Sequence, residues 1–117
     1  MEAEQRGRLA DILQAGRLIA SYVQGVAPED FLADIEKQDA VIPRIEIIGE
    51  AARHLTEETR AAIPALPFRR MRGMRNIVAH DYANVAMPVV WEVATQHVPE
   101  LIRILEEFFA TSSSDQP

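Results

Sequence analysis

The sequence predicts an all-α protein, an up-down bundle of four to five helices. Apolar residues recur three and four positions apart over long stretches of the chain, which is the period of a helix with one buried face. The alternation of apolar and polar residues that predicts a strand is absent throughout. Glycine and proline fall mainly between the periodic stretches, where they end one helix and start the next.

Composition predicts one globular domain over residues 1–110 and a frayed polar tail over residues 111–117. The chain has 117 residues, of which 48% are hydrophobic and 26% charged, enough to bury a single core. It has no cysteine, which excludes a disulfide framework, a thiolate zinc site and a cysteine nucleophile. The acidic start, Met1 to Glu4, lacks a long apolar stretch, and no apolar run approaches the roughly 20 residues that cross a bilayer. We therefore expect a cytoplasmic protein without a membrane partner.

The first helix is expected from about Glu4 to Gln24, because apolar residues recur there at helical spacing, namely Leu9, Ile12, Leu13, Ile19 and Val23. Gly25 should end this helix, and Pro28 favours the start of a second helical stretch that runs to about His54. Pro43 lies inside this stretch and should kink or divide it, because proline removes one backbone hydrogen bond.

The second stretch carries an acidic stripe on a different face from its apolar residues. The stripe consists of Asp39, Glu46, Glu50 and Arg53, at steps of seven, four and three. A stripe of this kind is usually a solvated face, but an arginine-rich segment elsewhere in the chain needs partners. Both interpretations stay open, and we prefer the one in which at least one carboxylate pairs with Arg75 or Arg72 and orients it. Gly49, between the carboxylates, should mark a close approach of two helices.

A short helical turn is expected at Thr56 to Glu58, and Pro64 and Pro67 close it. The segment that follows should form a helix from Phe68 to about His80. Its inward face carries Met71, Met74 and Val78, and its outward stripe carries Arg72, Asn76 and His80. Arg75 lies next to this outward stripe, and its long side chain can bend into it.

The last helix is expected from about Met87 to Ala110, with Pro88 in its first turn and a bend at Pro99. Trp91 belongs to the core or to an interface. Apolar residues lie on more than one face of this helix, as they do in the second stretch. So small a bundle cannot bury all of these apolar residues internally. We therefore expect a homodimer with two-fold symmetry.

The positive charge of the chain is concentrated in one place. Four of the eleven arginines, Arg69, Arg70, Arg72 and Arg75, fall within seven positions of a chain whose net charge is -6. The acidic balance argues against a general coat for nucleic acid, but not against a local phosphate site. Lys37 is the only lysine, so the positive charge is almost wholly arginine, whose planar fork binds phosphate through two hydrogen bonds.

The residues around this arginine run suggest RNA cleavage. RNA carries its own nucleophile, the 2′-hydroxyl, so cleavage needs a base near that hydroxyl, a cation at the phosphorane and a group that orients the phosphate. His80, Arg75 and Asn76 supply these groups without a metal or other cofactor, and the candidates to bind further RNA phosphate are Arg69, Arg70 and Arg72. On spacing alone, a helix that ends in these residue types is more often a hydrogen-bonded terminus than an active site. His54 and His97 fit surface or helix-end positions better than metal ligation.

The stretch Arg75-Asn76-x-x-x-His80-x-Tyr82 resembles the Arg-x4-6-His motif of HEPN domains. It is most similar to the HepT-like toxins, which carry a tyrosine two residues after the histidine. The pattern of the family's second helix is resembled by Asp39 to Val41 together with Glu46 to Ala51. Pro67 to Met74 resemble the segment before the motif, and Trp91 falls where the family's last helix begins. The similarity covers roughly Ile12 to Leu105.

The resemblance implies a concrete function. HepT-like proteins are small all-α ribonucleases, the toxin half of toxin–antitoxin pairs, and they act as homodimers whose two motifs line one shared cleft. Their partner is a minimal nucleotidyltransferase that attaches AMP to the motif tyrosine and silences the nuclease. By position, Arg75, Asn76 and His80 become catalytic residues and Tyr82 the modification site. The alternative is a non-catalytic HEPN module that docks to a nucleotidyltransferase or presents a substrate to it.

Overall fold

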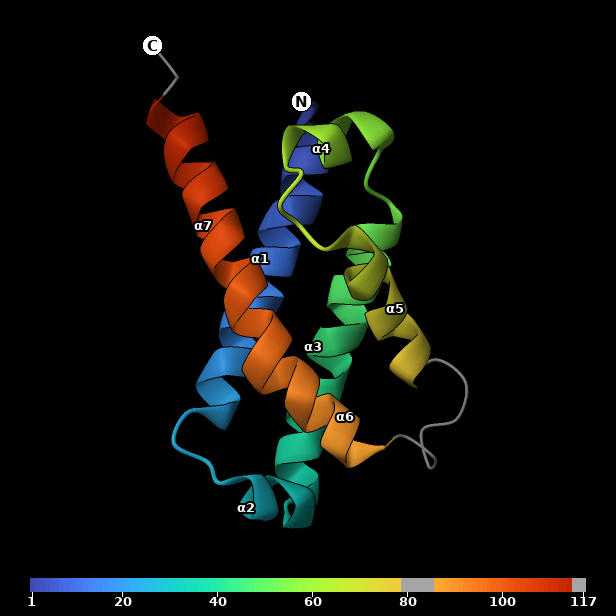
Figure 1. The fold of residues 1–117 in the computed structure, drawn as a ribbon, viewed down its shortest axis with the longest axis vertical. Coiled ribbons are helices and arrows are strands. Elements are labelled where there is room, and N and C mark those ends of the chain that lie inside the picture. Colours follow the sequence, from blue (N-terminus) through green and yellow to red (C-terminus); the bar gives the residue numbers. More distant parts are fainter. Residues whose placement is uncertain (79–85, 115–117) are drawn as a thin grey trace.

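Four long helical segments run alternately down and up through the molecule (Figure 1). They are α1 (Ala3–Val23), α3 (Ile35–Arg53), α5 (Phe68–Val78) and a continuous run of α6 (Met87–Glu92), the π-helical turn η2 (Val93–His97) and α7 (Val98–Ser114). Two short helices connect them, α2 (Pro28–Ala33) before α3 and α4 (Glu57–Ala62) before α5. The computed structural model describes residues 1–78 and 86–114, and within them every regular element is helical. The predicted all-α bundle is confirmed for these residues, with α2 and α4 as short additions to the four long segments.

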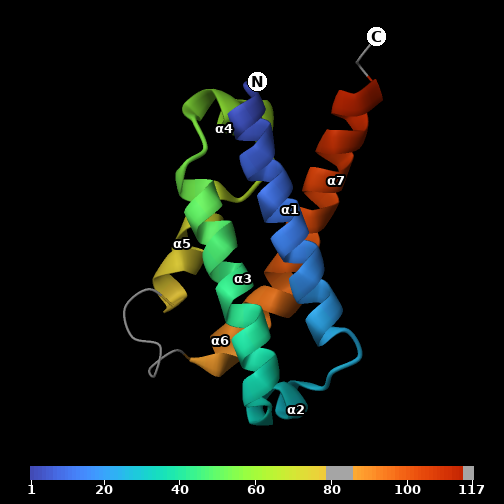
Figure 2. The same cartoon turned by 180° about the vertical axis from the view of Figure 1, so that it is seen from behind.

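The helices pack side by side in an order that leaves α5 at one edge. Figure 2, the view from behind, shows α1 beside α3, with α7 along α1 and α5 on the outer side of α3. α5 therefore meets the bundle mainly through α3. On the opposite face of α5, Arg72 and Asn76 are exposed, and no helix among the described residues covers them.

Local sequence sets several of the helix ends. Gly25 adopts a φ of +73°, which glycine tolerates, and the chain turns there after α1 as predicted. The side chain of Asp34 accepts a hydrogen bond from the backbone nitrogen of Lys37 at 3.0 Å and caps α3. Thr56 caps α4 in the same way, by accepting from the backbone nitrogen of Thr59 at 3.2 Å.

The second helical stretch divides at Asp34, whereas the sequence led us to expect a kink or a division at Pro43. α3 runs without interruption through Pro43. The side chain of Asp34 provides the cap that starts a new helix, whereas Pro43 removes only one bond from a helix already held by its neighbours. Among these, Ile42 and Ile45 are 1% and 0% exposed and anchor this part of α3 in the core.

The last helix widens into η2, which ends two residues before Pro99. In a regular α-helix the ring of Pro99 would collide with the carbonyl four residues earlier. The last helix then continues to Ser114, past the end expected at about Ala110, so the first four residues of the predicted tail are helical. This extension is joined to α1, because Arg6 Nη1 donates to Ser112 Oγ at 2.6 Å.

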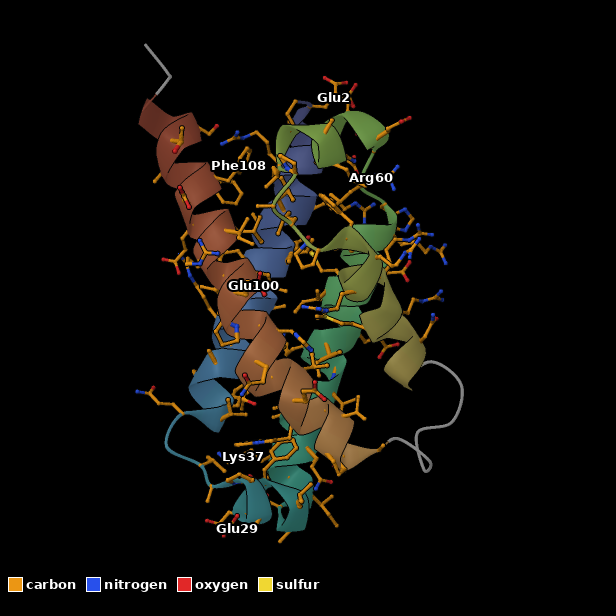
Figure 3. All side chains as sticks on the ribbon, viewed as in Figure 1. Glu2, Glu29, Lys37, Arg60, Glu100 and Phe108 are labelled. Atoms are coloured by element: carbon orange, nitrogen blue, oxygen red, sulfur yellow. The ribbon has the colours of Figure 1, made fainter. Side chains whose placement is uncertain are left out.

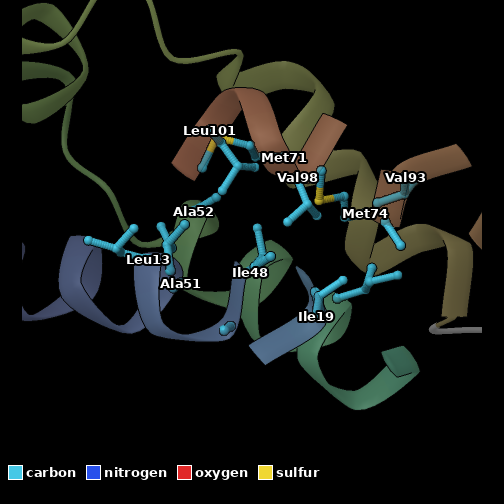
Figure 4. Packing of buried hydrophobic residues seen from close by; sticks show 14 of the residues in the cluster. Leu13, Ile19, Ile48, Ala51, Ala52, Met71, Met74, Val93, Val98 and Leu101 are labelled. Carbon is cyan, nitrogen blue, oxygen red and sulfur yellow. The ribbon is translucent and has the colours of Figure 1, made fainter. Parts of the chain in front are cut away.

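The core lies between α1, α3, α5 and α7, and Figure 4 shows its packing. Its large, fully buried side chains include Leu9, Ile12 and Ile19 of α1, Ile42, Ile45 and Ile48 of α3, Met71 and Met74 of α5, and Leu101 and Leu105 of α7. Trp91 packs on Phe31 with ring centroids 5.1 Å apart, at the edge of this core. Across residues 1–78 and 86–114, no helix has the length and apolar character needed to span a membrane.

Candidate functional site

A pocket of about 720 Å³ opens beside α5, and its walls are rich in arginine. They come from the end of α3, from α4 and from the open face of α5, through Arg53, Arg60, Phe68, Arg69, Arg72, Gly73, Arg75 and Asn76. Five of the chain's eleven arginines therefore meet in one place. Figure 3 shows nitrogen-tipped side chains gathered beside α5 and the end of α3, below the labelled Arg60.

The amphipathic character of α5 brings its arginines to this pocket. Met71 and Met74 are 0% and 1% exposed and lie in the core, as predicted from their spacing. Arg72 and Asn76 are exposed on the open side of the same helix. α5 contains four arginines and no acidic residue, so its charge is opposite in sign to the net charge of the chain.

The backbone of Arg75 lies directly against Gly49 of α3. A Cβ atom at Gly49 would lie 2.5 Å from the backbone nitrogen of Arg75 and 2.7 Å from its Cβ, closer than real Cβ atoms approach other atoms. The contact between α3 and α5 therefore requires glycine at this position. The prediction that Gly49 marks a close helix approach is confirmed, and the approaching helix is the one that carries the motif.

The side chain of Arg75 is held by Glu50, the residue after Gly49. Arg75 Nε lies 2.9 Å from Glu50 Oε2, and the two side chains are 41% and 42% exposed. The pairing that we expected for at least one acidic residue of the stripe is thus made by Glu50. Asp39 and Glu46 are exposed on the same helix, and neither belongs to the pocket lining that the described residues form.

Glu50 is itself held in its ionised form. Its Oε1 lies 3.2 Å from Nε2 of His54, which caps the end of α3 and is exposed, as expected of a helix-end histidine. The hydrogen bond with His54 and the positive charges of Arg53 and Arg75 hold the pKa of Glu50 below its ordinary value of 4.5, against a smaller opposing effect of burial. At neutral pH Glu50 is therefore a carboxylate, and it keeps Arg75 paired.

Arg70 does not share the pocket with the other arginines of α5. Its Nη1 lies 3.1 Å from Nδ1 of His97 in η2, and His97 Nε2 lies 3.7 Å from Glu92 Oε1. This chain of contacts joins α5 to the last helix. The three arginines predicted to bind phosphate are thus divided, with Arg69 and Arg72 in the pocket lining and Arg70 outside it.

Sequence reasoning missed four residues of the pocket, Arg53, Arg60, Phe68 and Gly73. Arg53 was assigned to the acidic stripe, although it is the last residue of α3 and reaches the pocket from there. Arg60 is the basic residue in the last turn of α4, and no local pattern indicates that α4 returns to the side of α5.

The remaining motif residues, His80 and Tyr82, belong to residues 79–85, which lie outside the part of the chain that the structure describes. The geometry of the site therefore concerns Arg75, Asn76 and their surroundings. Within residues 1–78 and 86–114, no group of three or more histidine, aspartate or glutamate side chains is arranged to hold a metal ion.

Comparison with known proteins identifies the family. The family model described as "Ribonuclease HepT-like" matches residues 12–108. The chain belongs to this family. The resemblance seen in the sequence, over roughly Ile12 to Leu105, is thereby confirmed.

Individual relatives support the same assignment. A protein of Thermococcus cleftensis named "Probable ribonuclease HepT" is 35% identical over 101 residues, which cover 86% of this chain and 92% of that protein. A Caldanaerobacter subterraneus protein named "Putative RNase TTE0752" is 33% identical over 87% of this chain and 91% of its own length. In Methanocaldococcus jannaschii, a protein named "Gamma-glutamylcyclotransferase and putative RNase MJ0434" is 37% identical, and the match covers 46% of that longer chain. No solved structure gives a significant match.

Proposed function

We propose that this protein is a metal-independent endoribonuclease that cleaves RNA through the RNA's own 2′-hydroxyl. The observation that carries the proposal is the placement of Arg75. In a member of a ribonuclease family, the motif arginine lines an arginine-rich pocket, with its side chain against Glu50 and its backbone against Gly49. A cation that is already in position needs no reorganisation when negative charge develops in the transition state.

In this reaction His80 takes the proton of the 2′-hydroxyl as general base, and the freed oxygen attacks the neighbouring phosphorus. The bond from phosphorus to the 5′-oxygen of the next nucleotide breaks, that oxygen takes up a proton, and a 2′,3′-cyclic phosphate remains. Arg75 is engaged by Glu50 through Nε, so its Nη groups stabilise the charge on the phosphorane. Asn76, which lines the same pocket, orients the phosphate.

A cleavage assay with purified protein and a short single-stranded RNA tests this proposal, and cleavage should persist in EDTA. His80→Ala should lower the rate by ~10²–10⁴-fold, the usual cost of losing a general base. Arg75→Lys should be nearly as severe, because lysine cannot make the bidentate contact. Arg103→Gln, a change of an exposed arginine that pairs with Glu107 on α7, is the matched control and should cut like the wild type.

Two results would contradict the ribonuclease assignment. One is wild-type cleavage by His80→Ala, and the other is a strict requirement for a divalent metal. Absence of cleavage by the wild-type protein, together with specific binding to a nucleotidyltransferase, would favour the alternative of a non-catalytic docking module.

The proposed ribonuclease is the toxin of a toxin–antitoxin pair, and its partner is a minimal nucleotidyltransferase that attaches AMP to Tyr82. One AMP adds a negative phosphodiester and a bulky adenosine two residues past His80. Its phosphate would bind Arg75 or Arg72 by charge-assisted hydrogen bonds and occupy the place of the substrate phosphate. The arginine lining of the pocket supports this mode of inhibition, which requires no refolding.

Tyr82→Phe separates regulation from catalysis, because the phenol takes no part in the proposed chemical step. The variant should cut RNA like the wild type and should escape silencing by the transferase. Intact mass after incubation with the transferase and ATP should increase by one AMP in the wild type only. An AMP adduct on Tyr82→Phe, or full cleavage by the modified wild type, would show that the regulatory assignment is wrong.

A further inference from the structure

The arginine pocket extends well beyond the motif residues Arg75 and Asn76. Along α5 alone, Arg69 and Arg75 are six residues apart, which corresponds to about 9 Å of helix. That span exceeds the size of one phosphate group. Arg53 and Arg60 add charge from two other helices, and the volume of about 720 Å³ is that of a site for a nucleotide-sized ligand.

Among the residues that the structure describes, most arginines of this pocket form no salt bridge with a carboxylate. Within the described parts of the chain, Arg75 is the one pocket arginine that forms a salt bridge, through Glu50. Arg53, Arg60, Arg69 and Arg72 line the same space without one. Guanidinium groups gathered in this way repel one another, and a ligand with several phosphates in succession relieves the repulsion better than a single phosphate does.

Phe68 adds an aromatic surface to this charged pocket. It packs against the core and is only partly buried. It lines the arginine pocket and also an adjoining hollow with Pro67, Arg69 and Arg70. An aromatic ring beside arginines is the combination that binds single-stranded nucleic acid, because the ring stacks on a base while the cations bind the backbone.

We propose that Arg53, Arg60, Phe68 and Arg69 form a flanking subsite, which binds a nucleotide of the RNA strand next to the one that is cut. Phe68 stacks on the base, and the arginines bind the phosphate. The inference rests on the proposed ribonuclease function and adds a preference for single-stranded RNA longer than a dinucleotide. A concave pocket with an aromatic wall suits unpaired bases, whereas a duplex keeps its bases stacked inside.

Binding of fluorescein-labelled oligouridines, followed by anisotropy in a His80→Ala background, tests the flanking subsite. The probes are a dinucleotide and a hexanucleotide. The double variant Arg53→Gln/Arg60→Gln should bind the hexanucleotide about 10- to 100-fold more weakly. The slope of the logarithm of the affinity against the logarithm of the salt concentration should become shallower by about 0.7 for each lost phosphate contact. Binding of the dinucleotide, which fills only the part of the pocket around Arg75, should change little.

Two further variants complete the experiment. Phe68→Leu keeps an apolar side chain against the core but removes the ring, and it should weaken hexanucleotide binding about 10-fold without changing the salt dependence. Arg103→Gln removes one positive charge from α7, outside the pocket, and should bind like the His80→Ala parent. Circular dichroism and urea unfolding identify any variant that fails to fold.

The outcomes separate the flanking subsite from the ribonuclease proposal. If the wild type cuts RNA and the Arg53/Arg60 variant binds both probes like its parent, the flanking subsite is overturned and the ribonuclease proposal stands. If the wild type does not cut RNA but hexanucleotide binding depends on Arg53 and Arg60, the subsite stands as an RNA site and the ribonuclease proposal is wrong. If free AMP binds as tightly as the hexanucleotide and is equally weakened in the variant, the pocket is a mononucleotide site and the flanking subsite is overturned.

Discussion

Arg75 makes three separate contributions to the site. Its backbone contacts Gly49, its Nε contacts Glu50, and its side chain lines the pocket. Four other arginines line the same space and repel it, so the carboxylate of Glu50 is needed to hold its charge in place. The chemistry proposed for Arg75 therefore depends on an acidic residue that touches no substrate atom.

The first prediction at this scale concerns the pH dependence that Glu50 confers on stability. Its pKa in the folded protein lies below 4.5, so its contribution is fully present above that value and is lost as the pH falls through the lowered pKa. Glu50→Gln has no such contribution to lose. Urea unfolding at about pH 7 and about pH 3 should therefore show a smaller fall in unfolding free energy for Glu50→Gln than for the wild type.

Glu46→Gln is the matched control for this experiment, because Glu46 is exposed on the same helix and does not line the pocket. This variant should follow the wild type between the two pH values. An equal fall in unfolding free energy for the wild type and Glu50→Gln would contradict the stabilisation assigned to the contacts of the Glu50 carboxylate with His54 and Arg75.

At the scale of the helices, the contact between α3 and α5 places the motif. α5 has few other neighbours in the bundle, so the close approach at Gly49 decides where its arginines lie. The atom that a side chain at this position would meet first is the backbone nitrogen of Arg75, which cannot turn aside as a side chain can.

Gly49→Ala is therefore expected to move α5 as a whole. Overpacking of this kind costs about 1–3 kcal/mol of unfolding free energy, and it also separates Arg75 from Glu50. Urea unfolding should show the destabilisation, and RNA cleavage should fall with it. Gly7→Ala on α1 is the control, since its Cβ would meet nothing within 4 Å. It should stabilise the protein by about 0.5–1 kcal/mol. A Gly49→Ala variant as stable and active as the wild type would contradict the proposed packing.

Much of this helical arrangement could be predicted from local patterns. The inward positions of Met71 and Met74 follow from helical spacing, and the close approach at Gly49 follows from a glycine among larger residues. The break at Asp34 was missed because a side-chain cap and a proline both signal a boundary, and only packing decides between them. Local sequence could indicate that a boundary exists in this stretch, but not where it falls.

The missed pocket residues depend on contacts between distant parts of the chain. Gln5 of α1 is 3% exposed, donates to the carbonyl oxygen of His54 at 3.0 Å and accepts from the backbone nitrogen of Thr56 at 2.8 Å. These bonds fix the start of α4 beside α1, and they join residues about fifty positions apart. Because no periodicity encodes such a contact, the sequence could not place Arg60 in the pocket.

At the scale of the whole molecule, the charge of the pocket opposes the charge of the chain. The net charge is -6, while the described residues that line the pocket include five arginines and no acidic residue. A negatively charged strand is therefore repelled at long range and attracted close to α5. This distribution favours binding at one place over coating of the surface by nucleic acid, and salt should weaken the attraction.

We infer an apolar patch on the surface from three exposed side chains on adjoining elements, Leu32 of α2, Ile35 at the start of α3 and Val89 of α6. Their exposed fractions are 45%, 71% and 41%, and α2 packs against α6 so that the three elements adjoin. A bundle of this size cannot bury such a patch internally. We predict that two copies of the chain cover it in a two-fold dimer.

Light scattering on the wild type and two variants tests the dimer and its surface. The wild type should have twice the chain mass of 13.1 kDa. Ile35→Glu places a charge at the most exposed residue of the patch, and its desolvation on association should shift the protein to the monomer. Ile47→Glu, at a residue of α3 that is 38% exposed but not part of the patch, should stay dimeric. A monomeric wild type at micromolar concentration would contradict the dimer itself. A dimeric Ile35→Glu would place the interface on another face, because a buried and unpaired glutamate in a small interface is too unfavourable for the dimer to persist.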